Sequence, residues 1–93
     1  MNAAPARQRL DKWLWYARMA RTRSAAARLV SEGAVRVNGV RADAPARAVK
    51  VGDVLTLALP HATRVVAIRD LGERRGPALE AAGLYDDIGG SGD

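Results

Sequence analysis

The chain has 93 residues and no cysteine, and it carries a formal net charge of +5 at pH 7 with a sequence pI near 10.7. This length allows one small domain, and the lack of cysteine excludes disulfides, thiolate metal sites and thiol nucleophiles. The sequence has neither an apolar run of membrane-spanning length nor an apolar N-terminal block typical of a signal peptide, so we expect a cytoplasmic protein that does not contact membranes. A small body with this charge favours an anionic polymer as its partner.

The positive charge is concentrated in the first half of the chain. Residues 7–50 contain eleven basic and three acidic side chains, whereas residues 51–93 are mildly acidic. Thirteen of the fifteen basic residues are arginine, whose planar guanidinium binds phosphate with two parallel hydrogen bonds. The N-terminal half is therefore predicted to supply a basic surface.

The first predicted element is a helix that runs from about residue 9 to residue 19, after a flexible arm over residues 1–7. Apolar side chains recur at helical spacing and define the inward face: Leu10, Trp13, Leu14 and Ala17. A second stripe forms a basic ridge with an aromatic ring beside it: Arg9, Lys12 and Tyr16. Trp15 points away from the inward face, so it either packs against the C-terminal segment or offers an exposed stacking surface.

A second helix is predicted to end at Glu32, before a glycine stop at Gly33. Either Thr22 or Ser24 supplies the hydroxyl that caps its first turn. The buried side of this helix is predicted to consist of Ala26, Leu29 and Val30. The opposite side carries Ser24, Arg28 and Ser31.

The apolar period then changes from 3.6 to 2, which predicts a sheet. Asn38-Gly39 between alternating residues indicates a hairpin with a type I′ turn, in which Arg36 faces Arg41. Two opposed arginines repel unless their side chains splay into water or straddle a phosphate, and both alternatives stay open. Further strands are predicted over 54–59 and 64–69, a short helix over 76–83, and a disordered, Gly-rich acidic tail over 86–93.

Enzymatic constellations are hard to assemble from this sequence. His61 is the only histidine, and neither a carboxylate partner nor a nucleophile lies near it in sequence. The chain has no glycine-rich phosphate loop and no metal-ligand spacing. We therefore expect a protein that is not an enzyme, with no catalytic residue, metal or cofactor.

An anion-binding site is predicted at the start of the second helix. Arg21 and Arg23 flank a position where free backbone N–H groups and the positive end of the helix dipole already favour phosphate. Arg28 lies one turn further along the same face, and Arg9 and Lys12 supply the other wall. Arginine at a helix N-terminus is electrostatically disfavoured in isolation, which favours an external anion.

The linked motifs resemble a known RNA-binding module. Their order is a helix, Arg-x-Arg-Ser before a second helix, glycine, a Val-x-Val-Asn-Gly hairpin, and Val-Gly-Asp before a strand. Residues 9–59 thereby resemble the domain typified by the small-subunit ribosomal protein S-four, the alpha-L motif. Residues 9–15, residues 64–76 and Leu84-Tyr85 are similar to the stand-alone fifteen-kilodalton heat-shock protein branch of that group.

The resemblance implies a fold, a function and a site. The fold would be α+β, with two helices packed on a small twisted antiparallel sheet and a short C-terminal helix, in one RNA-binding domain over 8–85. The function would be non-catalytic binding of structured ribosomal RNA, on large ribosomal subunits that carry peptidyl-tRNA, in the recycling of stalled translation. We expect a monomer. The implied RNA-binding residues are Arg9, Lys12, Arg21, Thr22, Arg23, Ser24, Arg28 and Lys50.

Three other functions compete with this interpretation. Two short helices with a basic turn would suit a DNA-binding helix-turn-helix protein, and weak duplex DNA binding follows from charge alone. The module is also an accessory of RNA-modifying systems, although a catalytic domain needs more chain. A third alternative is an assembly protein that binds a protein partner through Trp15 and the acidic half. Phosphate binding weakens steeply with salt, which distinguishes it from apolar docking.

Overall fold

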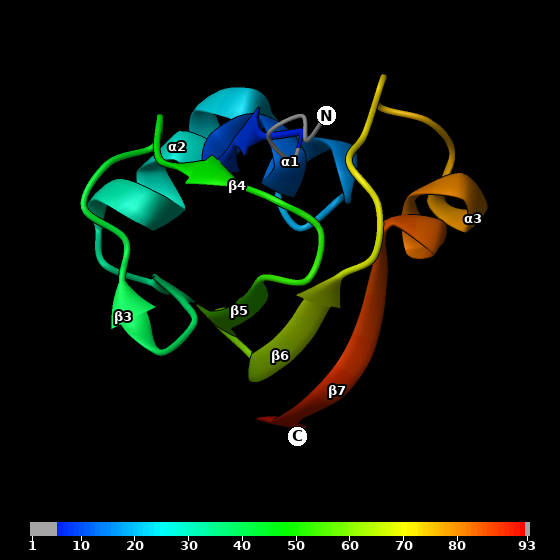
Figure 1. The fold of residues 1–93 in the computed structure, drawn as a ribbon. Helices are drawn as coiled ribbons and strands as arrows, with labels where there is room; N and C mark the ends of the chain where they lie inside the picture. The colour runs from blue at the N-terminus through cyan, green and yellow to red at the C-terminus, as the bar shows by residue number, and fades with distance from the viewer. Residues whose placement is uncertain (1–5, 93) are drawn as a thin grey trace.

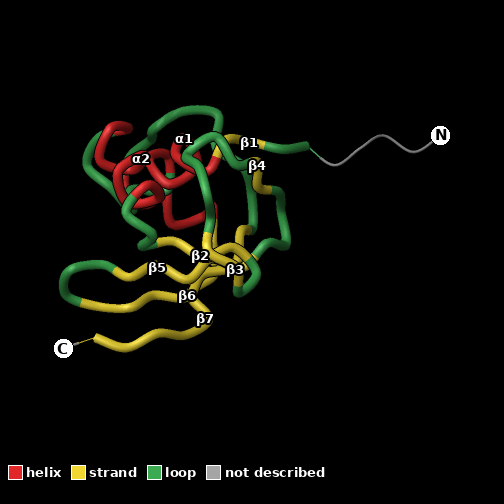
Figure 2. Tube along the Cα trace, turned by 90° about the vertical axis from the view of Figure 1, so that its left-hand side faces the viewer, coloured by secondary structure: helices red, strands yellow, loops and turns green. Residues whose placement is uncertain are grey.

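A five-stranded antiparallel sheet with two helices on one face makes up most of the computed structural model, which describes residues 6–92 (Figures 1 and 2). The elements in chain order are β1 (Gln8–Arg9), α1 (Leu10–Tyr16), α2 (Arg23–Ser31), β2 (Val35–Val37), β3 (Val40–Arg41), β4 (Ala48–Val49), β5 (Val54–Ala58), β6 (Ala62–Ile68), α3 (Ala78–Ala81), a 3₁₀ turn (Ala82–Leu84) and β7 (Tyr85–Gly92). Most of the arm predicted over 1–7 lies outside the described residues. Ala6 and Arg7 have no regular secondary structure.

The strand order is β3-β2-β5-β6-β7, with every neighbouring pair antiparallel. A separate two-stranded ladder joins β1 to β4, with Gln8 opposite Val49 and Arg9 opposite Ala48. The sequence did not predict this ladder, because each strand has only two residues. The predicted α+β class, with two helices on a small antiparallel sheet and a short C-terminal helix, is confirmed.

The core lies between α1, α2 and the inner face of the sheet. The predicted inward face of α1 is confirmed, since Leu10, Trp13, Leu14 and Ala17 are all buried. Opposite them lie the alternating inward side chains of the sheet: Val35, Val37, Leu55, Leu57, Val66 and Ile68. Burial of each large apolar side chain stabilises the fold by about 1.5–3 kcal/mol. The Trp13 indole N–H donates to the Asp70 carbonyl at 2.9 Å, and Tyr85 packs edge-on against the same ring.

Helix α1 ends at Tyr16, three residues before the predicted end. Arg18 adopts a left-handed φ of 61°, and the Met19 N–H donates to the Leu14 carbonyl at 2.9 Å, which closes the helix. A left-handed non-glycine residue costs about 1 kcal/mol or more. The Arg18 guanidinium offsets part of that cost by donating to the Gly76 carbonyl at 2.8 Å.

The hairpin has the predicted register, with Arg36 opposite Arg41. Its turn residues have positive φ values, 52° at Asn38 and 83° at Gly39, as a type I′ turn requires. The guanidinium of Arg41 turns onto Gly33, where an added Cβ would lie 2.6 Å from its carbon atom. Arg41 therefore extends away from the turn toward the end of α2.

The prediction of a disordered tail over 86–93 is wrong for residues 86–92. These residues belong to β7, which pairs with β6 from Ile68 opposite Tyr85 to Ala62 opposite Gly92, and Asp93 lies outside the described residues. Gly90 has a φ of 127°, and a Cβ there would collide with the Thr63 carbonyl. The glycine therefore permits close approach to β6 beside a register shift at Val65/Val66.

Candidate nucleic-acid interface

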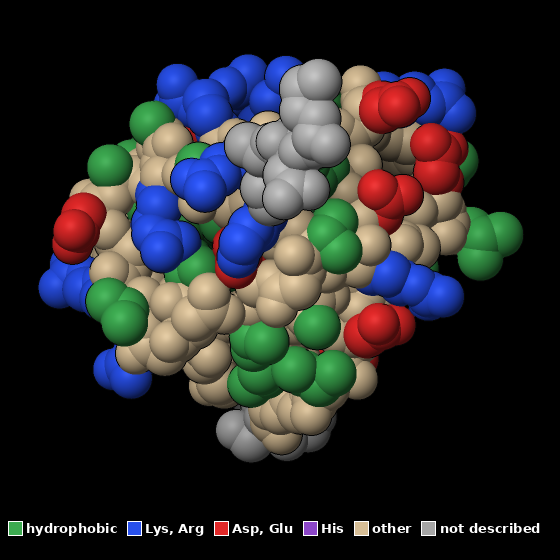
Figure 3. Space-filling view, in the orientation of Figure 1, with side chains coloured by type: hydrophobic (Ala, Val, Ile, Leu, Met, Phe, Trp, Pro, Cys, Tyr) green, Lys and Arg blue, Asp and Glu red, His purple; other side chains and the backbone are tan. Residues whose placement is uncertain are grey.

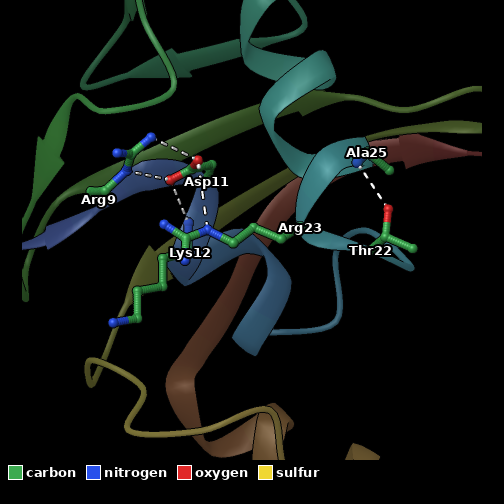
Figure 4. Close-up of polar contacts among 6 residues, drawn as sticks. All are labelled: Arg9, Asp11, Lys12, Thr22, Arg23 and Ala25. Carbon is green, nitrogen blue, oxygen red and sulfur yellow. Dashed lines mark hydrogen bonds and ion pairs between the residues drawn. The ribbon is translucent and has the colours of Figure 1, made fainter.

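A buried carboxylate joins the starts of the two helices. Asp11, in the first turn of α1, accepts two hydrogen bonds from the Arg9 guanidinium, both at 3.1 Å (Figure 4). The Arg23 Nε lies 3.9 Å from Oδ2 of the same carboxylate. The Asp11 side chain is 5% exposed, whereas those of Arg9 and Arg23 are 51% and 45% exposed. Asp11 thus holds two predicted RNA-binding arginines side by side while both remain open to solvent.

The start of α2 combines free backbone donors with basic side chains. Thr22 is the N-cap, because its hydroxyl oxygen accepts the Ala25 N–H at 3.0 Å, whereas Ser24 lies exposed inside the first turn (Figure 4). This decides between the two predicted capping residues. The first turn contains no acidic side chain, so Arg21 and Arg23 lie at the positive end of the helix dipole without a local counter-charge on α2.

Arg21 and Arg28 both line a shallow groove of about 390 Å³ beside α2. Both side chains are exposed, in agreement with the polar face predicted for the helix. The rest of the groove is apolar apart from Glu32 and is lined by Met19, Ala20, Ala25, Leu29, Leu59 and Pro60. The groove therefore places two guanidinium groups beside an apolar floor.

Lys12 lies over an aromatic pair on α1. Its Nζ is 5.7 Å from the centre of the Tyr16 ring, and Tyr16 stacks on Trp15 with ring centres 5.5 Å apart. Arg75 covers Trp15 at 5.8 Å and donates through Nε to the Trp15 carbonyl. Of the two predicted roles of Trp15, the structure shows packing against the C-terminal segment.

Lys50 belongs to a different cluster from the other predicted site residues. Its Nζ lies 2.8 Å from Asp53, a buried carboxylate that also accepts from the Lys50 N–H and from Asn38. Burial alone would raise the pKa of Asp53, but the hydrogen bonds from Lys50 and Asn38 outweigh it and hold the pKa below the ordinary value of 3.8. Lys50 is thus bent onto a structural turn rather than toward α2.

Ion pairing differs between the two halves of the chain. In the C-terminal half, three arginines each contact a carboxylate: Arg64 with Asp87, Arg69 with Asp86 and Arg74 with Glu80. Within residues 6–92, the structure records no ion pair for Arg7, Arg21, Arg28, Arg36, Arg41 or Arg47. Figure 3 shows the resulting asymmetry, with basic side chains gathered over the side of α1, α2 and β4 and most acidic ones on the side of α3.

The sequence did not identify Asp11, Arg7 or Arg47 as parts of the basic surface. Asp11 lies in the first turn of a predicted helix between basic residues, and this position is the signal that could have identified it as part of the site. The positions of Arg7 and Arg47 depend on the β1–β4 ladder, for which the sequence carries no pattern. They line a small pocket with Lys50.

Neither a metal-binding cluster nor a membrane-spanning helix is found in the described part of the chain. Within residues 6–92, no group of three or more histidine, cysteine, aspartate or glutamate side chains is arranged to hold a metal ion. None of the helices in this range has the length and hydropathy needed to cross a membrane.

Comparison with known proteins places the chain in a family. The S4 domain model matches residues 8–55. Heat shock protein 15 of Escherichia coli strain K12 is 42% identical over 79 residues, which cover 85% of this chain and 59% of that protein. The small ribosomal subunit protein uS4 of Erythrobacter litoralis is 39% identical over 83 residues, which cover 87% of this chain and 41% of that protein. The chain thus spans about three fifths of the length of the heat shock protein 15 relative.

A solved structure is similar over nearly the whole chain. Heat shock protein 15 of Vibrio cholerae, described as trimeric, superposes with a TM-score of 0.84 at 40% identity, and the match covers 89% of this chain and 83% of that one. The helices, the sheet and the order of motifs therefore have a counterpart in a solved relative. The chain belongs to the S4 domain family, in the branch represented by the heat shock protein 15 sequences.

Proposed function

We propose that this protein is a non-catalytic RNA-binding protein that holds structured RNA by its phosphates. The observation that carries the proposal is the buried Asp11, which fixes Arg9 and Arg23 together beside the free N–H groups of α2. Guanidinium groups and a helix N-terminus both bind phosphate, and their convergence gives one anion several donors. The α2 cluster, defined as Arg9, Lys12, Arg21, Thr22, Arg23, Ser24 and Arg28, is the proposed contact surface.

The basic charge of this surface is available to a ligand. Three arginines of the C-terminal half are neutralised by carboxylates, whereas Arg21 and Arg28 have no such partner within residues 6–92. Phosphate contacts of this kind position a protein on a nucleic acid without reading its sequence. Structured RNA is recognised mostly by shape and by backbone contacts, which suits such a surface.

Family membership supports a finer proposal about the target. The matches include a small ribosomal subunit protein and several heat shock proteins. We propose ribosomal RNA as the target, on the large subunit carrying peptidyl-tRNA, in the recycling of stalled translation during stress. This finer proposal rests on the resemblance of the sequence to the stand-alone fifteen-kilodalton heat-shock protein branch.

The DNA-binding alternative has weaker support in the geometry. A recognition helix presents side chains that read base edges in the major groove. The exposed residues of α2 instead offer the hydroxyl groups of Ser24 and Ser31 and the guanidinium groups of Arg23 and Arg28. Any binding to duplex DNA is expected to be weak, nonspecific and driven by charge.

The Arg21→Ala, Arg23→Ala double variant tests the proposal. We expect the affinity for structured RNA to fall about tenfold or more, which corresponds to about 1.4 kcal/mol, with a nearly unchanged Tm because both side chains are exposed. The matched control is Arg69→Ala, Arg74→Ala, which removes the same charge from surface ion pairs in the C-terminal half. Equal loss of affinity in both variants would reduce the interaction to net charge, and unfolding of the first variant would assign its arginines to structure.

We also infer that the chain self-associates, in place of the monomer expected from its sequence. The solved relative from Vibrio cholerae is described as trimeric. Strand β7 lies at the edge of the sheet, and an edge strand offers backbone groups for pairing. Sedimentation velocity over a concentration series measures this directly, and a single monomeric species at every concentration would refute it.

A further inference from the structure

A small polar pocket lies at the β1–β4 ladder, separate from the groove beside α2. It has a volume of about 150 Å³ and is lined by Arg7, Asn38, Arg47, Lys50 and Asp53, together with the adjoining residues of β4. A cavity of roughly this volume can hold a benzene ring, so a phosphate group fits within it. Three of these lining residues are basic, namely Arg7, Arg47 and Lys50.

The β1–β4 ladder holds the backbone segments that carry these basic residues close together. Gln8 pairs with Val49, and Arg7 and Lys50 are the residues that adjoin this pair at the end of the ladder. The Leu10 N–H donates to the Arg47 carbonyl at 2.8 Å, which fixes the backbone of Arg47 beside the same ladder. Arg7 and Arg47 both line the pocket and carry like charges, and an anion bound between them would lower their repulsion.

Among the residues of 6–92 that line the pocket, one is a carboxylate, Asp53, and it already has hydrogen-bond partners. Asp53 accepts from the Lys50 N–H at 3.0 Å, from the Lys50 Nζ at 2.8 Å and from Asn38 at 3.1 Å. Lys50 therefore neutralises Asp53, and the structure records no ion pair for Arg7 or Arg47 within residues 6–92. Both arginines are exposed, so the pocket retains two cationic donors for a ligand.

The pocket and the α2 cluster are connected along β1. Gln8 turns toward Gly72, to which its amide donates at 2.8 Å. Arg7, directly before β1, lines the pocket, and Arg9, the second residue of β1, directly precedes α1. Arg9 is also held by Asp11 beside Arg23. Basic side chains thus lead from the start of α2, along β1, to the pocket.

We propose that this pocket is a second phosphate-binding subsite, in which Arg7 and Arg47 hold a backbone phosphate of the same RNA that the α2 cluster contacts. The inference rests on the proposed function and adds a defined ligand group and two residues to it. Guanidinium groups bind phosphate oxygens with short, charge-assisted hydrogen bonds. Lys50 supports the subsite indirectly, since it neutralises the Asp53 carboxylate that would otherwise repel a phosphate.

The test compares Arg7→Ala, Arg47→Ala with the control Arg69→Ala, Arg74→Ala, measuring RNA affinity across a salt series. Lys50 is left intact because its loss would strand the buried Asp53. We expect the first variant to lose about tenfold in affinity and to lower the slope of log affinity against log salt by about two, one for each phosphate contact removed. The control should keep the wild-type slope.

Titration with inorganic phosphate, followed by NMR of the backbone amides, identifies the ligand group. Shifts at Asn38 and Arg47 that vanish in the Arg7→Ala, Arg47→Ala variant are expected. Phosphate shifts without any loss of RNA affinity in that variant would overturn the RNA assignment and leave a free-phosphate site. Unchanged affinity and no shifts would overturn the subsite altogether, whereas loss of binding in Arg21→Ala, Arg23→Ala would still support the proposed function. Failure of the wild-type protein to bind structured RNA would instead refute the proposed function itself.

Discussion

At the residue scale, Asp11 shows how one acidic side chain can serve a basic surface. Its carboxylate is buried, yet it contacts two arginines that are about half exposed. By orienting Arg9 and Arg23 it reduces the side-chain entropy that a bound phosphate would otherwise have to remove. We therefore regard Asp11 as a positioning residue for the α2 cluster.

Asp11→Asn separates positioning from simple charge. The substitution makes the protein more positive, so an account based on net charge predicts tighter RNA binding. We expect weaker binding instead, by about threefold to tenfold, or roughly 0.7–1.4 kcal/mol, because the arginines lose their common anchor. The free energy of unfolding should fall by only about 1 kcal/mol, since both arginines can return to water.

Asp43→Asn is the matched control for this measurement. Asp43 is an exposed acid in the same half of the chain, so its loss changes the charge equally without touching the anchor. We expect its RNA affinity to stay equal to that of the wild type or to rise. Tighter binding in both variants would refute the positioning role of Asp11.

Asp53 makes the stability of the protein depend on pH. Its pKa in the folded protein lies below the ordinary value of 3.8, because the hydrogen bonds from Lys50 and Asn38 outweigh burial. Its stabilising contribution is therefore complete well above pH 3.8 and is lost as pH falls through 3.8 toward the folded-state pKa. Urea unfolding of Asp53→Asn between pH 7 and pH 2 should show a flatter acid limb than the wild type or Asp43→Asn. Identical limbs in all three proteins would contradict this assignment.

At the element scale, the sequence predicts what local interactions determine. The inward face of α1 follows from helical spacing, and the hairpin follows from the Asn38-Gly39 turn, whose positive φ values few other pairs adopt. The end of α1 was placed too late because Arg18 takes a left-handed conformation that its residue type does not suggest. A hydrogen bond to the distant Gly76 holds it there.

The sequence does not predict the strands whose pairing partners lie far away along the chain. Strand β7 is rich in glycine and aspartate, a composition typical of disorder, yet it pairs with β6 along its length. Two aspartates of β7 form ion pairs with nearby arginines. Asp87 contacts Arg64 of β6, and Asp86 contacts Arg69, which directly follows β6. The same reason explains the missed pocket, because β1 and β4 meet only after the chain has folded.

Gly90→Ala tests the glycine that lets β7 approach β6. An added Cβ would strike the Thr63 carbonyl, and the φ of 127° is unfavourable for any side chain. We expect the free energy of unfolding to fall by about 1–3 kcal/mol and the amide protons of the β6–β7 pairing to exchange faster. Gly83→Ala is the control, because its Cβ would meet no atom within 4 Å. Equal stability of the two variants would refute the close approach.

At the scale of the whole molecule, the fold separates two kinds of charged surface. The acidic C-terminal half neutralises three of its four arginines through ion pairs with Asp86, Asp87 and Glu80. The side of α1, α2 and β4 keeps its arginines available (Figure 3). The charge asymmetry in the sequence predicted this division, but which arginines are held together depends on Asp11 and on the β1–β4 ladder.

Cosedimentation with separated ribosomal subunits is the decisive test of the proposal that the protein binds large subunits through the α2 cluster. Purified protein is mixed with small subunits and with large subunits, the latter with and without peptidyl-tRNA, across a salt series and beside the Arg21→Ala, Arg23→Ala variant. We expect the wild-type protein to bind selectively to large subunits carrying peptidyl-tRNA, and we expect this binding to weaken steeply with salt and to be lost in the variant. Equal binding to both subunits would contradict the proposed target, and binding that neither salt nor the variant weakens would contradict phosphate recognition by the α2 cluster.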